Sequence, residues 1–146
     1  MQPTSQLTHI LGQIPWDLTQ SAQDNIEHLP EVLDEPGRYP AIAQLLNRPI
    51  PGLRRVKIYY PMTEDYYHPV EYATQRDITP IEVLNSMSEF YAQPFTQANA
   101  DAIGQLMGQE VVLALPDDRV ADLLGGHVFF EGLMPYQDAF TLSLGS

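Results

Sequence analysis

Prolines set the strongest constraint on what this chain can fold into, because seven of the 13 lie within the first 51 residues. Proline lacks a backbone N–H and clashes with the preceding turn, so it ends or kinks a helix that it interrupts. We therefore expect irregular backbone in this first third, with one short helix over 41–47. Residues 1–14 are expected to form a flexible N-terminal segment, and residues 15–146 a single domain.

Length and cysteine content narrow the class of protein. A chain of 146 residues suits one hydrophobic core, since domains cluster near ~100–150 residues. The sequence has no cysteine, which excludes a disulfide scaffold, a zinc finger, an iron–sulfur site and a thiol nucleophile. It also lacks an apolar run long enough for a signal peptide or a membrane span, so we expect a soluble, cytoplasmic protein.

The charge balance is strongly acidic, with 19 acidic against 7 basic side chains and a formal net charge of -12. This charge repels phosphate backbones and anionic lipid, so neither nucleic acid nor a membrane is expected as a partner. Two runs stand out, a basic one at Arg48, Arg54, Arg55 and Lys57 and an acidic one at Asp24, Glu27, Glu31, Asp34 and Glu35. Both are interpreted as solvated faces, with an anion-binding site on the basic run as the alternative.

A β-hairpin is predicted after the Pro51-Gly52 turn. Residues 55–60 alternate charged and apolar side chains, which is typical of a strand buried on one face. Residues 67–73 are expected to form the partner strand. Pro69 cannot donate a ladder hydrogen bond, so this second strand is expected at an edge of the sheet.

Two consecutive helices follow. Thr79, Pro80 and Glu82 form the clearest helix start, because threonine can cap the helix and Glu82 can return a bond to the threonine N–H. We expect helices over 80–92 and 97–107, a short helix over 119–124, and strands over 111–115, 128–133 and 140–144. This order predicts an α+β fold, an antiparallel sheet of about four or five strands with the helix pair packed on one face.

Five short segments carry a resemblance to a known family. They are Pro15-Trp16-Asp17-Leu18, the basic strand after the Pro-Gly turn, Ile78 to Leu84, Gln93-Pro94-Phe95-Thr96, and Arg119 to Gly126 followed by Phe130-Glu131-Gly132-Leu133. In this order, over roughly residues 15–145, the chain resembles a family of uncharacterised domains abundant in mushroom-forming fungi. The resemblance implies a fold and an origin, and it supplies no catalytic residue.

The candidate binding residues gather on the predicted hairpin, where residues 59–72 hold five of the eight tyrosines. Tyrosines and carboxylates on a loop can stack on and hydrogen-bond a sugar, or offer contact area to a protein. The candidates are Tyr59, Glu64, Asp65, Tyr66, Tyr67 and His68, joined by Arg54, Arg55 and Lys57.

Several of these aromatic and acidic residues have alternative interpretations. Tyr60 and Tyr72 are expected to face the core of the sheet. Trp16 is interpreted as a core anchor, and a stacking platform for a ligand is the less favoured alternative. A metal site on Asp65, His68 and Glu71 is the minor alternative for the hairpin.

No nucleotide-binding or hydrolase motif occurs, so no catalytic residue, cofactor or metal is predicted. We expect a non-enzymatic protein-interaction or self-association module, with a protein partner or a second copy, as in a homodimer, on the tyrosine-rich hairpin. The alternative is a small-ligand or carbohydrate-binding domain that uses the same hairpin.

Overall fold

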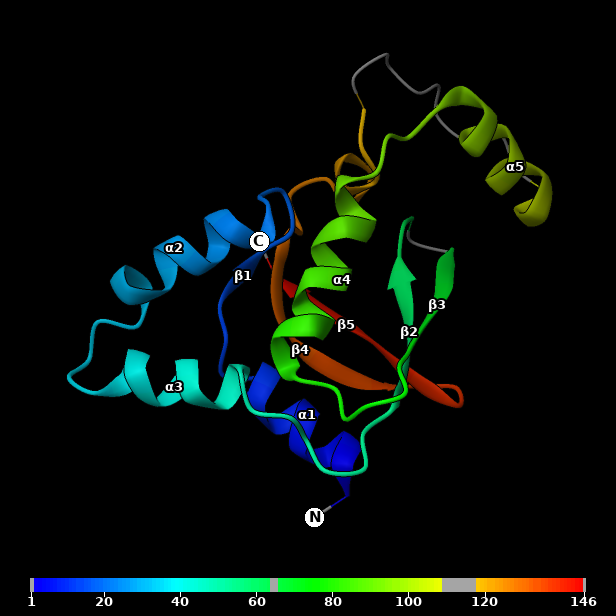
Figure 1. The fold of residues 1–146 in the computed structure, drawn as a ribbon. Helices are drawn as coiled ribbons and strands as arrows, with labels where there is room; N and C mark the ends of the chain where they lie inside the picture. The colour runs from blue at the N-terminus through cyan, green and yellow to red at the C-terminus, as the bar shows by residue number, and fades with distance from the viewer. Residues whose placement is uncertain (1, 64–65, 109–117, 146) are drawn as a thin grey trace.

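The computed structural model of the chain describes residues 2–63, 66–108 and 118–145. In chain order the elements are α1 (Pro3–Leu11), β1 (Trp16–Asp17), α2 (Ala22–Val32), α3 (Arg38–Leu46), β2 (Arg55–Pro61), β3 (Tyr67–Ala73), α4 (Pro80–Ala92), α5 (Gln97–Met107), the 3-10 helix η1 (Val120–Leu124), β4 (Phe129–Tyr136) and β5 (Ala139–Gly145) (Figure 1). The predicted α+β class is confirmed. The strand predicted over 111–115 lies outside the described residues.

The strands form one sheet in the order β1-β4-β5-β2-β3. Both hairpins, β2–β3 and β4–β5, are antiparallel, but β2 and β5 pair in parallel at Ile58↔Phe140. The sheet is therefore mixed, where a purely antiparallel one was expected. The physical reason is the long connection through α4 and α5, which carries the chain from the end of the sheet where β3 finishes to the opposite end. β4 therefore runs antiparallel to β2, and its hairpin partner β5 runs parallel to β2.

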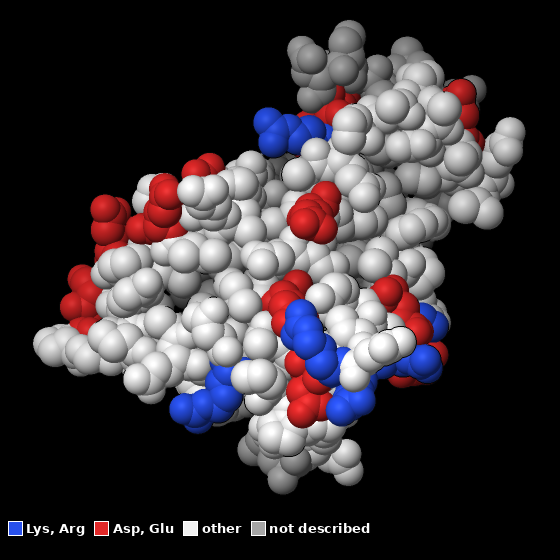
Figure 2. All heavy atoms as spheres, viewed as in Figure 1, with Lys and Arg blue, Asp and Glu red and all other residues white. Residues whose placement is uncertain are grey.

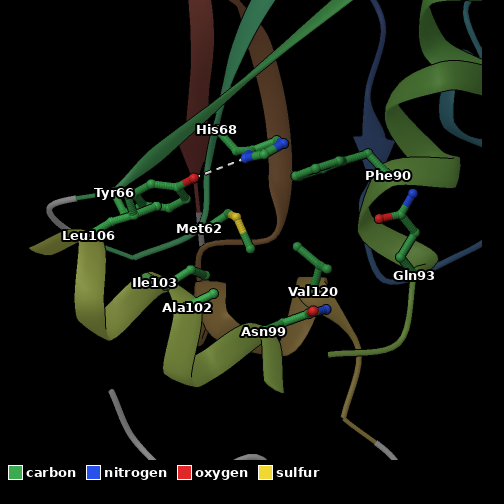
Figure 3. Close-up of a pocket in the computed structure, with 10 residues that line it drawn as sticks. All are labelled: Met62, Tyr66, His68, Phe90, Gln93, Asn99, Ala102, Ile103, Leu106 and Val120. Atoms are coloured by element: carbon green, nitrogen blue, oxygen red, sulfur yellow. Dashed lines mark hydrogen bonds between the residues drawn. The ribbon is translucent and has the colours of Figure 1, made fainter. Parts of the chain in front are cut away.

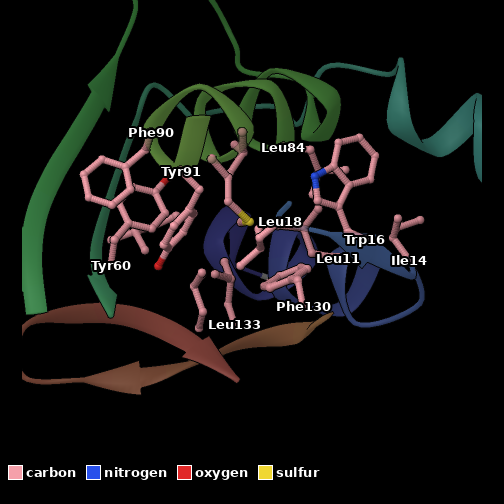
Figure 4. Packing of buried hydrophobic residues seen from close by; sticks show 14 of the residues in the cluster. Leu11, Ile14, Trp16, Leu18, Tyr60, Leu84, Phe90, Tyr91, Phe130 and Leu133 are labelled. Carbon is pink, nitrogen blue, oxygen red and sulfur yellow. The ribbon is translucent and has the colours of Figure 1, made fainter. Parts of the chain in front are cut away.

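One face of the sheet carries the hydrophobic core (Figure 4). Leu84 and Tyr91 of α4 lie above it, and Tyr60 of β2 and Phe130 of β4 meet them from the strands. Trp16 is 1% exposed, and its indole Nε1 donates a hydrogen bond to Ser88 Oγ at 2.8 Å. The only tryptophan is thus a core anchor, as one of the two interpretations held.

The first third of the chain is more helical than the prolines suggest. Pro3 stands in the first turn of α1, where the N–H that proline lacks has no helical partner. Ser21 caps α2 by accepting from the Asp24 N–H, and Pro30 falls only two residues before the helix ends. The prolines therefore lie where helices start and finish, and three helices fit between them.

Helix α1 corrects the expectation of a flexible segment over 1–14. Leu7 and Leu11 are 0% exposed, and Ile10 is buried beside them. They recur at the three- and four-residue spacing that places side chains on one face of a helix. This face packs into the main core, so α1 is part of the folded unit.

The cap of α4 differs in one respect from the predicted pattern. Thr79 Oγ1 accepts a hydrogen bond from the Glu82 N–H, as expected. The Glu82 carboxylate, however, accepts from Tyr72 Oη at 2.9 Å and from the Arg76 guanidinium. The carboxylate therefore fastens β3 and the following loop to the first turn of α4.

This contact predicts an acid-sensitive contribution to stability. Burial alone would raise the pKa of Glu82, but hydrogen bonds from Arg76, Tyr72 and Thr79 outweigh it and hold the pKa below its ordinary value. A lowered folded pKa stabilises the protein above the unfolded pKa, and this stabilisation is lost as the pH falls through the folded pKa. Glu82→Gln is expected to cost about 1–2 kcal/mol at pH 7 and less at about pH 3, where more of the carboxylate is protonated.

Urea unfolding at both pH values, followed by far-UV circular dichroism, measures the difference. Glu89→Gln on the exposed side of the same helix is the matched control, and it should unfold like the unchanged protein. Equal losses for Glu82→Gln at both pH values would contradict the assignment.

None of the described helices is long and apolar enough to cross a membrane.

Candidate functional site

The hairpin divides the predicted binding residues between two faces of the sheet, because successive side chains of a strand point to opposite sides. The His68 ring stacks on Phe90 of α4, with centroids 5.8 Å apart, and Tyr66 Oη lies 3.0 Å from His68 Nδ1. Tyr59 and Tyr67 lie on the other face, where Tyr67 stacks on Tyr136 with centroids 4.9 Å apart. The predicted residues thus supply two separate surfaces.

Two of the predicted site residues, Glu64 and Asp65, lie outside the described residues. Within the described ranges, no group of three or more histidine and acidic side chains is placed to hold a metal ion. The alternative that joins Asp65 to His68 and Glu71 in a metal site stays a prediction.

The predicted basic residues are each close to a carboxylate. Arg54 lies 3.2 Å from Asp77, Arg55 lies 3.0 Å from Glu71, and Lys57 lies 3.3 Å from Asp138. Hydrogen bonds with Tyr59 and Asp138 raise the pKa of Lys57, and hydrogen bonds donated by Tyr59 and Lys57 lower the pKa of Asp138. Because these cations face local carboxylates, the arrangement gives little support to an anion-binding site on this run.

Among the described residues no strand pairs with the outer edge of β3, and Pro69 interrupts this edge. The Thr74 N–H bonds to the Arg54 carbonyl and the Met62 N–H to the Tyr66 carbonyl, so even-numbered residues of the strand bond to β2. Pro69 is odd-numbered and turns its backbone nitrogen toward solvent, in the middle of the open edge. An incoming strand would find no donor there, which disfavours strand addition.

Pro69→Thr is therefore expected to promote self-association, because threonine restores the missing N–H and favours extended backbone. Analytical ultracentrifugation over a concentration series should show an added dimer or larger species for Pro69→Thr alone. Glu71→Thr, two residues along the same edge, is the matched control, since its N–H is already present. Monomeric behaviour of Pro69→Thr at every concentration would contradict this role.

The face of the sheet opposite α4 carries a second group of aromatic residues, which we call the open-face cluster: Tyr59, Tyr67, Met134 and Tyr136. Met134 is 45% exposed, and Tyr59 Oη donates to Asp138 at 3.0 Å. The Tyr67 and Tyr136 rings are nearly parallel, at 10°. Because they cover each other's faces, they leave less flat ring surface for a sugar than separate tyrosines would.

A cavity lies on the α4 side, between α5 and the loop end of the hairpin (Figure 3). Its volume is about 320 Å³. The apolar lining residues are Met62, Phe90, Ala102, Ile103, Leu106 and Val120, and the polar ones are Tyr66, His68, Gln93 and Asn99. We call this the α5 pocket.

Helix α5 is held over this pocket by a short bridge at its base. The Phe95 N–H bonds to the Asp118 carbonyl at 2.8 Å, and the Val120 N–H bonds to the Gln93 carbonyl at 2.9 Å. From this bridge α5 projects past the end of the sheet (Figure 1). The helix is anchored by buried Ala100 and Ile103, while Leu106 at the pocket rim is 73% exposed.

The pocket combines apolar walls with a few polar groups. Tyr66 and His68 form a hydrogen-bonded pair on the hairpin wall, and the amides of Gln93 and Asn99 lie across from them (Figure 3). Among the described residues that line it there is no charged side chain. The sequence pointed to Tyr66 and His68 but not to the α5 wall. The spacing of apolar residues in α5 predicts a helix, but it does not indicate that this helix extends past the end of the sheet.

Comparison of the chain with family models, with curated proteins and with solved structures finds no match. The resemblance to the fungal family therefore stays a prediction, and the function is argued from the geometry of the chain itself.

Proposed function

We propose that the protein is a non-enzymatic binding protein for a small, neutral and largely apolar molecule, held in the α5 pocket. The pocket's volume carries the proposal, because about 320 Å³ falls within the range of known ligand sites, which starts near ~300 Å³. Mostly apolar walls with a few convergent polar groups are typical of such sites. This is the ligand-binding alternative, moved from the hairpin alone to the space between hairpin and helix.

The lining determines the chemistry of the ligand. Apolar side chains of Met62, Phe90 and Ile103 favour an apolar body, and the Tyr66 hydroxyl can fix one polar group of the ligand. A charged ligand would lose its hydration without meeting a counter-charge, which costs several kcal/mol. The net charge of -12 opposes anions further.

Two dyes with the same rings test this chemistry. N-phenyl-1-naphthylamine is neutral, and 1-anilinonaphthalene-8-sulfonate adds one sulfonate to the same skeleton. We expect the neutral dye to bind with a rise in fluorescence and the sulfonated dye to bind at least ~10-fold more weakly. Equal or stronger binding of the sulfonated dye would overturn the proposal.

Three variants test whether the neutral dye binds in the α5 pocket. Ala102→Phe fills the space from the α5 wall and should abolish binding of the neutral dye. Tyr66→Phe removes one hydroxyl and should weaken it about fivefold, the effect of one hydrogen bond of ~1 kcal/mol. Tyr59→Phe makes the same change on the other face of the sheet and should leave the Kd unchanged. Dye binding that survives Ala102→Phe would place the ligand elsewhere.

A second candidate function is protein interaction through the open-face cluster, the class expected first from the sequence. The exposure of Met134 beside three tyrosines favours it, since tyrosine and methionine are enriched at interfaces. Met134→Ser with Tyr67→Ser should then lower the sedimentation coefficient of any self-associated species, while the Kd of the neutral dye is kept. If the unchanged protein self-associates and the double variant sediments in the same way, the open-face cluster is not the interface.

A further inference from the structure

A groove separate from both of these surfaces runs along α2. Two hollows, of about 450 and 300 Å³, share Pro15, Trp16, Val32 and Phe129 in their linings and so adjoin one another. One wall is a stripe of α2 that includes Asn25, His28 and Val32, and Phe129 of β4 forms part of another wall. We call this the α2 groove.

Exposed apolar side chains concentrate at the α2 groove. Among the described residues, the large exposed hydrophobic side chains are Val32, Leu106, Phe129 and Met134. Val32 is 54% exposed and Phe129 is 47% exposed, and both line the groove, although they are far apart in sequence. Exposed apolar groups that meet in a hollow mark a site that another molecule can cover.

The outward backbone groups of Asp17, beside the groove, already have hydrogen-bond partners. The Asn25 side chain accepts from the Asp17 N–H at 2.8 Å and donates to the Asp17 carbonyl at 2.9 Å. It thereby occupies the outer edge of β1, as a further strand would. A partner must therefore bind through side-chain contacts and not by adding a strand.

The surroundings of the groove are acidic. Side chains of Asp24, Glu27, Glu31, Asp34 and Glu35 are exposed on α2 and the loop that follows, and Figure 2 shows acidic side chains gathered over this part of the molecule. Arg38, which also lines the groove, lies 3.9 Å from Glu35 and is partly neutralised. An apolar hollow with this rim is complementary to a segment that carries positive charge around an apolar residue.

We propose that the α2 groove binds a basic amphipathic segment of another protein. One bulky apolar side chain of the segment lies between Val32 and Phe129, and its Lys and Arg side chains face the carboxylates of α2. This inference goes beyond the proposed function and does not depend on it, since neither Val32 nor Phe129 lines the α5 pocket.

A synthetic peptide provides the probe. It is a fluorescein-labelled peptide of about 16 residues made of lysine and leucine, with the leucines at helical spacing and no tryptophan. Fluorescence anisotropy gives its Kd. Trp16 is the only tryptophan and lines the groove, so a change in its emission on peptide addition reports contact at this place.

Paired variants separate the groove from general attraction of a basic peptide to an acidic protein. Val32→Ser with Phe129→Ser should raise the Kd of the peptide at least ~10-fold. Met134→Ser, on the same strand as Phe129, should leave this Kd unchanged. Glu27→Lys with Glu31→Lys should weaken binding and flatten its salt dependence. Glu89→Lys with Asp101→Lys makes the same charge change elsewhere and should have a much smaller effect.

Two results would overturn the inference. The first is equal Kd values for the Val32→Ser/Phe129→Ser and Met134→Ser proteins. The second is equal binding of a control peptide in which glutamate replaces lysine. Binding that is lost with Ala102→Phe instead would assign the peptide to the α5 pocket. All these positions are exposed, so a thermal melt should confirm that each variant folds.

Discussion

A chain that starts at Gly12 is expected to be largely unfolded at 25 °C. The truncation removes α1 and with it Leu7, Ile10 and Leu11, which are buried in the main core. Burial of a large apolar side chain contributes ~1.5–3 kcal/mol, so the loss approaches the whole stability of an ordinary domain, ~5–15 kcal/mol.

Far-UV circular dichroism and a thermal melt measure the outcome. Leu7→Ser gives a graded form of the same test and should lower the Tm clearly, whereas Ser5→Ala on the exposed side of α1 should not. A truncated chain that melts cooperatively at the Tm of the intact chain would restore the view of residues 1–14 as a flexible segment.

The second large effect is expected at Trp16. Trp16→Ala should cost ~3–5 kcal/mol, because it leaves a cavity where a ring that is 1% exposed packs under α4. Ser88→Ala should cost ~1–3 kcal/mol, since the buried indole N–H then has lost its acceptor.

A double-mutant cycle separates the hydrogen bond from the packing. Once Trp16 is alanine, Ser88→Ala should have little further effect, because the donor is gone. Urea unfolding followed by circular dichroism measures all four proteins without relying on tryptophan emission. Additive losses for the two substitutions would show that the 2.8 Å contact contributes nothing of its own.

Local signals account for the elements that the sequence located well. Thr79 and Thr96 accept hydrogen bonds from the backbone N–H groups of Glu82 and Asn99, and Gly108 ends α5 in the left-handed conformation. The alternation over 55–60 and the placement of Pro69 describe a half-buried strand and its edge partner. Each of these features depends on neighbouring residues alone.

The parts that were missed depend on distant residues or on competing signals. Leu7, Ile10 and Leu11 have helical spacing, but the surrounding prolines argue for irregular backbone, and burial decided the outcome. The parallel pairing of β2 with β5 is set by a connection of more than fifty residues, for which no local rule exists.

The candidate site was predicted in part for the same reason. Tyr66 and His68 were among the candidates named on the hairpin, and the structure brings them together and adds the wall from α5. Tyr59 and Tyr67 were grouped with them by sequence position, although strand alternation places them on the opposite face. Val32 and Phe129 come together only because β1 pairs with β4. No residue spacing in the sequence predicts that these two distant residues line one groove.

The two edge strands of the sheet, β1 and β3, together limit how copies of this protein can assemble. At β1 the Asn25 side-chain amide hydrogen-bonds to the N–H and the carbonyl of Asp17, and at β3 Pro69 removes a donor from the middle of the edge. Cross-β fibrils grow by repeating backbone pairing from chain to chain. Because each of these two edges is obstructed at one of these points, the folded protein should resist seeding into fibrils even in concentrated solution, and assemblies that it forms should be finite and reversible.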